Sequence, residues 1–259
     1  MELDQIVDMD RFPLANPAFR AACRADLDRD GVLAMPGFLV PQAVETVRRE
    51  AVAHRDRAYF CAQDHTVYLS PPDPGFAADH PRNRLVASSK GCITDDIVPA
   101  DSPLRVLYDA ASFRGFLCDV LSETALYPYA DPLSSINIHY AETGQELGWH
   151  FDNSSFATTL MIQPAERGGR FEYIGGVRDA DAGDMNYDGV AAVLDGKATA
   201  KKLTMEAGTL VLFRGRNAIH RVTPNEGART RMLVVLAYNA QPGVSLSEAA
   251  RLTFYGRTR

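Results

Sequence analysis

The amino-acid sequence predicts an α+β fold in which helices come first and an antiparallel β-sandwich or barrel follows. Two observations carry this prediction. Apolar residues recur at helical spacing in the first half of the chain, and short β-rich runs separated by turn residues fill the second half. No repeat, low-complexity tract or linker divides the chain. We therefore expect one domain over residues 1–259, with a mainly helical support region over about 1–130 and a β-core over about 131–259.

Three segments of the front region have the features of helices. The first begins at Asn16 or Pro17 and runs towards Leu27. The second covers residues 41–55 and opens with a proline, the residue that favours the first helical turn. Residues 103–121 predict a further helix or a pair of helices. We expect these helices to pack on one side of the β-core.

The remaining parts of the front region and one later segment predict irregular structure. Residues 31–39 have the features of a strand and a turn. Residues 61–102 are rich in Pro, Asp and Gly, so we expect long loops with short structured pieces. Residues 175–202 are polar, rich in Gly and Asp, and lie between two β-rich runs. This segment is expected to form a lid or flap.

The second half of the chain contains the β-rich runs. They cover residues 134–140, 148–163, 168–174, 208–215 and 231–239. Turn residues separate them, and their spacing is typical of antiparallel sandwiches and barrels.

Charge and cysteine content narrow the range of partners. A formal net charge of −6, with no basic run longer than a pair, argues against nucleic acid. No apolar stretch reaches the roughly 18 residues of a membrane span, and the acidic N-terminus lacks the apolar core of a signal peptide. The four cysteines form no CxxC pair. We expect a cytoplasmic protein with a small-molecule substrate, and the sequence leaves the oligomeric state open.

Two side chains that favour a metal stand two residues apart. His150 and Asp152 lie in a strand-like stretch, where residues two apart point to the same face. A third ligand has to come from elsewhere, and His220 is the best-placed candidate. Two histidines and one carboxylate form the facial triad that holds Fe(II) in non-haem oxygenases and leaves coordination positions open. The same three residues could also serve a zinc hydrolase, and the β-core also fits a cupin-like binding protein without catalysis.

Two arginines follow the third candidate ligand. Arg229 and Arg231 share strand parity, so both can face inward. A guanidinium binds a carboxylate through two parallel hydrogen bonds, which suits the distal carboxylate of a 2-oxo diacid whose other end chelates the metal. We favour Arg231 because it leads directly into an apolar run, and Arg229 stays the alternative. Neither a zinc hydrolase nor a plain binding protein needs such an arginine.

The stretch from about residue 136 to residue 238 resembles the double-stranded β-helix core of the Fe(II)/2-oxoglutarate dioxygenase superfamily. Residues 149–152, 168–174, 207–224 and the two arginines carry this resemblance. It implies a jelly-roll core that uses Fe(II), 2-oxoglutarate and O2. It also implies an oxygenase that hydroxylates an unactivated C–H bond and releases succinate and CO2.

Within the superfamily, the chain is most similar to small bacterial enzymes that act on free or lightly derivatised amino acids. This group includes hydroxylases and radical halogenases. In the halogenases, glycine or alanine replaces the metal carboxylate and frees a coordination position for chloride. Asp152 fills that position here. The resemblance therefore implies hydroxylation, or another oxidation such as desaturation, rather than halogenation.

Further residues are candidates for contacts with the co-substrate and the substrate. Tyr140 resembles a tyrosine that hydrogen-bonds 2-oxoglutarate in related enzymes, and a packed aromatic residue fits the same position equally well. Arg84 and Lys90 are candidates for binding a substrate carboxylate, and Glu172 is a candidate for a substrate amine. Asn153 is expected either to contact the metal carboxylate or the substrate, or to terminate the strand.

Overall fold

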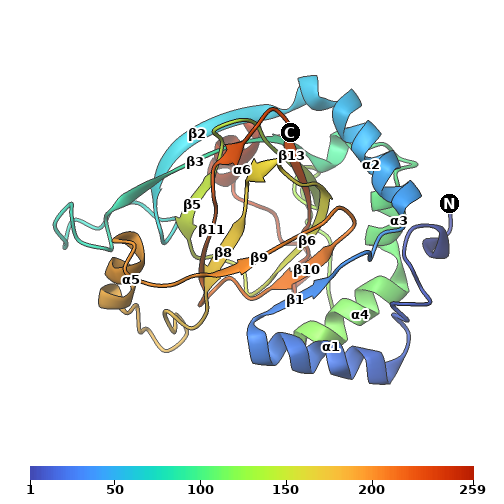
Figure 1. The fold of residues 1–259 in the computed structure, drawn as a ribbon, viewed down its shortest axis with the longest axis horizontal. Helices are drawn as coiled ribbons and strands as arrows, with labels where there is room; N and C mark the ends of the chain where they lie inside the picture. The colour runs from blue at the N-terminus through green and yellow to red at the C-terminus, as the bar shows by residue number, and fades with distance from the viewer.

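The structure, a computed structural model, describes all residues from 1 to 259 (Figure 1). The helices are α1 (Pro17–Asp30), α2 (Pro41–Ala53), α3 (Pro103–Asp109), α4 (Ala111–Leu121), α5 (Tyr187–Leu194) and α6 (Glu248–Tyr255). The strands are β1 (Val32–Met35), β2 (Tyr59–Thr66), β3 (Leu85–Ile93), β4 (Ile136–Ala141), β5 (Leu147–His150), β6 (Ala157–Gln163), β7 (Arg167–Gly168), β8 (Phe171–Ile174), β9 (Lys201–Leu203), β10 (Leu210–Phe213), β11 (Ile219–Val222), β12 (Asn225–Glu226) and β13 (Arg231–Leu236). None of these helices has the length and apolar character needed to cross a membrane.

The strands form one large sheet that curls into an open barrel (Figure 1). Neighbouring strands follow the order β1-β10-β6-β13-β4-β3-β5-β11-β8-β9, and β2 pairs with β3. Strands β7 and β12 form a separate two-stranded sheet. The predicted α+β fold with a jelly-roll core is confirmed, and strand β3 lies between β4 and β5 in the middle of the sheet.

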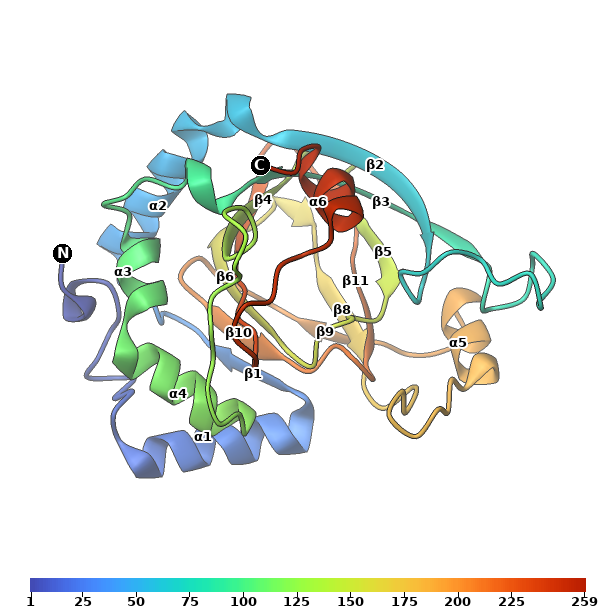
Figure 2. The same ribbon diagram turned by 180° about the vertical axis from the view of Figure 1, so that it is seen from behind.

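Helices α1 to α4 form a layer on one side of this sheet (Figure 2). The side chain of Asn16 caps α1 by accepting hydrogen bonds from the backbone N–H groups of Ala18 and Phe19, and a left-handed Gly31 ends the helix. The principal hydrophobic core has 36 buried residues and lies between the helical layer and strands β4, β6, β10 and β13. Residues 103–121 form a pair of helices, one of the two predicted alternatives.

The prediction of long loops over residues 61–102 holds for residues 67–84, which form a long loop, but it missed two strands, one on either side of this loop. Strands β2 and β3 pair with each other along their whole length, and only residues 67–84 between them form a loop. Alternate residues of β2, including Gln63 and His65, line a cavity instead of an apolar core. A half-buried strand is recognised in a sequence by apolar residues at every second position. In β2 polar residues stand at these positions, so the strand was not predicted.

Residues 175–202 leave the sheet between β8 and β9, as expected for an excursion, and contain helix α5. This segment packs on the loop between β2 and β3 (Figure 1). The Tyr187 ring lies 5.3 Å from the ring of Phe76 and 4.9 Å from that of His80. An ion pair between Arg84 and Asp195 at 2.6 Å joins the same two segments. The segment predicted as a lid and the loop between β2 and β3 thus form one packed unit.

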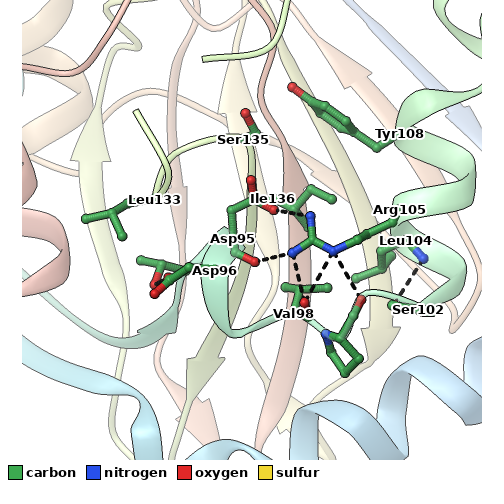
Figure 3. A network of polar contacts seen from close by, with 12 residues as sticks. Asp95, Asp96, Val98, Ser102, Leu104, Arg105, Tyr108, Leu133, Ser135 and Ile136 are labelled. Atoms are coloured by element: carbon green, nitrogen blue, oxygen red, sulfur yellow. Dashed lines mark hydrogen bonds and ion pairs between the residues drawn. The ribbon is translucent and has the colours of Figure 1, made fainter. Parts of the chain in front are cut away.

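Arg105 joins helix α3 to the segment that follows β3 (Figure 3). Its guanidinium donates to the Asp95 carboxylate at 2.8 Å and to the carbonyl oxygens of Val98 at 2.8 Å and Pro99 at 3.1 Å. The side chains of Arg105 and Asp95 are only 28% and 18% exposed. The guanidinium also donates to the backbone carbonyl of Asp95. This part-buried arginine therefore links the helical layer to the sheet through one charged and three backbone acceptors.

We expect Arg105→Met to lower the free energy of unfolding by about 1–3 kcal/mol, because a part-buried carboxylate and three carbonyl groups lose the hydrogen bonds that Arg105 donates. Urea denaturation of both proteins measures the difference. Arg24→Met is the matched control, since Arg24 is exposed and lies 3.7 Å from Asp28 within one helix. Such exposed pairs contribute about 0.5 kcal/mol. Equal losses for the two variants would contradict the assignment.

Candidate metal centre

The three candidate ligands converge at the ends of two neighbouring strands. His150 in β5 stands directly opposite His220 in β11, so both rings project from the same face of the sheet. Asp152 follows β5 by two residues, and its backbone N–H donates to the carbonyl of Gly215 at 3.1 Å. One ligand atom from each of the three side chains lies within 4.8 Å of the others. The structure therefore brings together the three residues that the sequence pointed to.

The two histidines both present the Nε2 atom to the carboxylate. Nε2 of His150 lies 3.9 Å, and Nε2 of His220 lies 3.5 Å, from Oδ1 of Asp152. The other ring nitrogen, Nδ1, faces a backbone carbonyl in each case: that of Gly148 at 2.8 Å and that of Ala218 at 3.0 Å. A carbonyl only accepts, so each Nδ1 carries the proton. Each Nε2 lone pair is then free to bind a metal.

The protonation states also suit a divalent cation. Burial, reinforced by the neighbouring His220, lowers the pKa of His150 to about 3, so its imidazole is neutral at physiological pH. Burial alone would raise the pKa of Asp152, but the two histidines outweigh this effect and lower it. The Oδ2 atom of Asp152 is buried without a hydrogen-bond partner. Two imidazoles that present Nε2 and one carboxylate with an unsatisfied oxygen match the donor set that holds Fe(II) in non-haem oxygenases.

Gly215 is a functional position that the sequence reasoning missed. A Cβ atom added at Gly215 would lie 1.9 Å from Oδ2 and 2.6 Å from Cγ of Asp152. Only glycine leaves room for the carboxylate in its present position. The sequence does contain a glycine at the end of the β-rich run before His220. A glycine at a strand end ordinarily indicates a turn, so its role beside Asp152 was not predicted.

The triad opens into a cavity of about 330 Å³ on the concave face of the sheet. Thirty residues line this cavity, and 17 of them are hydrophobic, so more than half of the wall around the metal side chains is apolar. Strands β2 and β3 supply part of the wall, including Gln63, His65, Ser88 and Lys90. Because residues 61–102 were expected to be loops, the contribution of β2 to this wall was missed.

Arg231 lies in the same cavity, whereas Arg229 does not. Arg231 is 5% exposed, and its Nε atom has no hydrogen-bond partner. Burial lowers the pKa of Arg231 to about 10, which still leaves it charged. The exposed Arg229 donates instead to the carbonyl of Ala165 at 3.2 Å. Of the two arginines left open by the sequence, the geometry places Arg231 where it can meet a carboxylate.

The expectation for Tyr140 is wrong. Its side chain is fully buried on the helical side of β4, where its hydroxyl donates to the carbonyl of Ala51 at 2.7 Å. Side chains alternate along a strand, so the preceding residue, His139, faces the cavity in its place. The structure shows Tyr140 as a packed aromatic residue, which was the alternative.

Three expected substrate contacts lie outside the cavity. Arg84 is paired with Asp195. Glu172 is buried against Arg221, whose guanidinium donates to it at 2.7–2.8 Å, on the face of β8 opposite to the metal side chains. The exposed Asn153 accepts a hydrogen bond from Arg216 through its backbone carbonyl. Each of these residues has a local partner or faces solvent, and none of them lines the cavity, so a substrate contact for them stays a prediction.

We expect Gly215→Ala to weaken metal binding about 10- to 100-fold, because the added methyl group displaces the Asp152 carboxylate. Anaerobic titration of the metal-free protein with Fe(II) measures the dissociation constant. Gly175→Ala is the control, since no atom lies within 4 Å of the added Cβ there. Unchanged affinity in Gly215→Ala would show that the metal does not use this carboxylate.

Several solved structures share this fold at low sequence identity. An oxidoreductase of the 2OG-Fe(II) oxygenase family from Burkholderia pseudomallei is 15% identical, with a TM-score of 0.54, over 89% of this chain and 95% of that chain. A prolyl-4-hydroxylase from Pseudomonas putida is 14% identical, with a TM-score of 0.52, over 83% and 96%. The epimerase SnoN, in complex with Fe3+, alpha ketoglutarate and nogalamycin RO, is 16% identical, with a TM-score of 0.58, over 86% and 84%.

These likenesses confirm the resemblance of the fold to the Fe(II)/2-oxoglutarate oxygenases. A search of curated proteins by sequence found no match. A family model described as halogenase D matches residues 82–252, which include the three candidate ligands and Arg231. Because this match covers most of the chain, the protein belongs to the halogenase D family.

Proposed function

We propose that this protein is an Fe(II)- and 2-oxoglutarate-dependent oxygenase that hydroxylates an unactivated C–H bond of a small polar substrate, a free or derivatised amino acid. The observation that carries the proposal is a buried guanidinium without a partner in the same cavity as a His-Asp-His triad. His150, Asp152 and His220 would hold Fe(II), and Arg231 would bind the distal carboxylate of 2-oxoglutarate. The family and the fold of the solved neighbours support the same reaction class.

Bound Fe(II), with 2-oxoglutarate and O2, supplies the oxidation. One oxygen atom of O2 enters the substrate C–H bond as a hydroxyl group, the other enters succinate, and CO2 leaves. The chain itself contributes position and electrostatics. The carbonyl groups of Gly148 and Ala218 hold the two imidazoles in the metal-binding tautomer, and the largely apolar wall limits access of water to the reacting atoms.

Two alternative functions would leave the buried arginine without a role. A zinc hydrolase with the same triad has no need of a buried arginine beside it, nor has a cupin-like binding protein. Desaturation on the same centre stays an alternative outcome, because the position of the substrate carbon decides between it and hydroxylation. Halogenation is disfavoured despite the family name, because Asp152 supplies a third protein ligand where a halogenase would bind chloride.

We expect Arg231→Met to raise the KM for 2-oxoglutarate about 30-fold or more, because the carboxylate would then be buried without its cation. Succinate formation with Fe(II), ascorbate and a panel of amino acids and their N-acyl derivatives provides the assay. The control is Arg229→Met, which removes an exposed arginine two residues earlier in the chain and should change the KM less than about threefold. Equal effects of the two substitutions would refute the role of Arg231.

We expect the wild-type enzyme to add one oxygen atom to its substrate even when chloride is abundant, because Asp152 occupies the required coordination position. Mass spectrometry of products formed under 18O2 identifies the origin of the added atom. Asp152→Gly should lose hydroxylation about 100-fold or more, since it removes one of three ligands and weakens metal binding. A chlorinated product from the wild-type enzyme would overturn the choice of hydroxylation.

A further inference from the structure

We propose that Lys90, assisted by His139, binds a carboxylate of the substrate, and that the substrate is an anion with an apolar body and no free ammonium group. This inference rests on the proposed function and narrows its substrate to derivatised amino acids, such as N-acyl amino acids, or related monocarboxylates. Three features of the cavity support it: the position of Lys90, the scarcity of acidic groups, and the balance of charge.

Lys90 faces the cavity from β3, the strand between β4 and the metal-bearing β5. Its Nζ atom lies 3.4–3.5 Å from the ring nitrogens of His139, and no carboxylate lies within ion-pair distance of it. Lys197 and Lys202, by contrast, are exposed and lie 3.0 Å and 3.9 Å from carboxylates. Burial lowers the pKa of Lys90, as expected for an ammonium group that lacks an anionic partner.

His139 has the properties of a neutral partner. Burial, together with the nearby charges of Lys90 and Arg231, lowers its pKa well below the ordinary value. The imidazole therefore stays uncharged between the two cations and can accept a hydrogen bond from Lys90. Because Lys90 retains further N–H groups, it can donate to a ligand at the same time.

Acidic groups are nearly absent from the cavity wall. Among its 30 residues the only carboxylate is Asp152, which belongs to the metal triad. A free amino acid would have to bury its ammonium group there without a counter-charge, and burying an unpaired charge costs several kcal/mol. An acylated amino group carries no charge and avoids this cost.

When the charges of the metal, the co-substrate and the cavity residues are added, Lys90 is the one charged group without an opposite charge. The two positive charges of Fe(II) cancel the two negative charges of 2-oxoglutarate, and Asp152 cancels Arg231. With neutral imidazoles, the charge of Lys90 remains, and one substrate carboxylate would neutralise it. Seventeen of the 30 wall residues are hydrophobic, with Leu147, Val235, Tyr238 and Phe254 among them. Such a wall suits an aliphatic or aromatic body.

Equilibrium binding tests the proposal without turnover. The protein is loaded with Zn(II) and 2-oxoglutarate, and ligand-observed NMR follows three sets of compounds that share the same side chains. These are N-acetyl amino acids, the free amino acids, and the neutral N-acetyl amino-acid amides, each with leucine, methionine and phenylalanine side chains. We expect at least one N-acetyl acid to bind about tenfold or more tightly than its amide and its free amino acid, because only the acid offers Lys90 an unaccompanied carboxylate.

The variants separate the role of Lys90 from the proposed function. Lys90→Met should weaken binding of the N-acetyl acid about tenfold or more, whereas Lys90→Arg should restore most of it and Lys197→Met should have no effect. All three variants should bind 2-oxoglutarate within about threefold of the wild type and unfold at a urea midpoint no lower than that of the wild type, since Lys90→Met removes a cation without a counter-charge. Loss of 2-oxoglutarate binding in Lys90→Met would assign Lys90 to the co-substrate and overturn this inference alone.

Two further outcomes would also overturn the inference: tighter binding of the free amino acids than of their N-acetyl forms, and a panel in which no N-acetyl acid binds. If the wild-type protein bound neither metal nor 2-oxoglutarate, the proposed function itself would fail, and this result is seen before any substrate compound is added.

Discussion

The metal centre depends on the register between strands β5 and β11. His150 lies opposite His220 in this antiparallel pair, which brings the two ring centroids within 4.2 Å of each other. A slip of one residue would turn one ring to the outer face of the sheet. Gly148 permits the close approach of β5 to β3, because a Cβ there would lie 2.5 Å from the carbonyl oxygen of Ala87. The backbone arrangement thus sets the ligand geometry before any metal binds.

Several charged side chains outside the barrel have partners of opposite charge, whereas the two cations inside it have none. On the outer surface and at the loops, Arg84 and Glu172 have partners of opposite charge. Inside, Arg231 and Lys90 have none. Cations without a counter-charge in such a cavity cost stability, and the core of 36 buried residues on the other side of the sheet offsets this cost. Under the proposed function, the ligands themselves would supply the missing negative charges.

Local patterns in the sequence predicted some residues of the site and missed others. His150 and Asp152 could be found from their spacing, although β5 ends at His150 and Asp152 lies in the segment that follows, where its backbone N–H donates to the carbonyl of Gly215. Tyr140 and His139 are adjacent, and local parity could not tell which of them faces the cavity. Strand β2 was missed because its cavity face carries Gln63 and His65 where a strand on a core would carry apolar residues. Periodicity detects burial against a core, and it does not detect polar residues that line a functional cavity.

The sequence by itself determined the order of helices before sheet, the candidate triad, and an arginine leading into the last core strand. These features depend on local periodicity, on strand parity and on resemblance. Only the tertiary structure decided that Arg231 rather than Arg229 enters the cavity, that Arg84 is neutralised by Asp195, and that Lys90 has no counter-charge. The reason is physical: the partner of a charged group comes from a distant part of the chain, and for Arg84 that partner is 111 residues away.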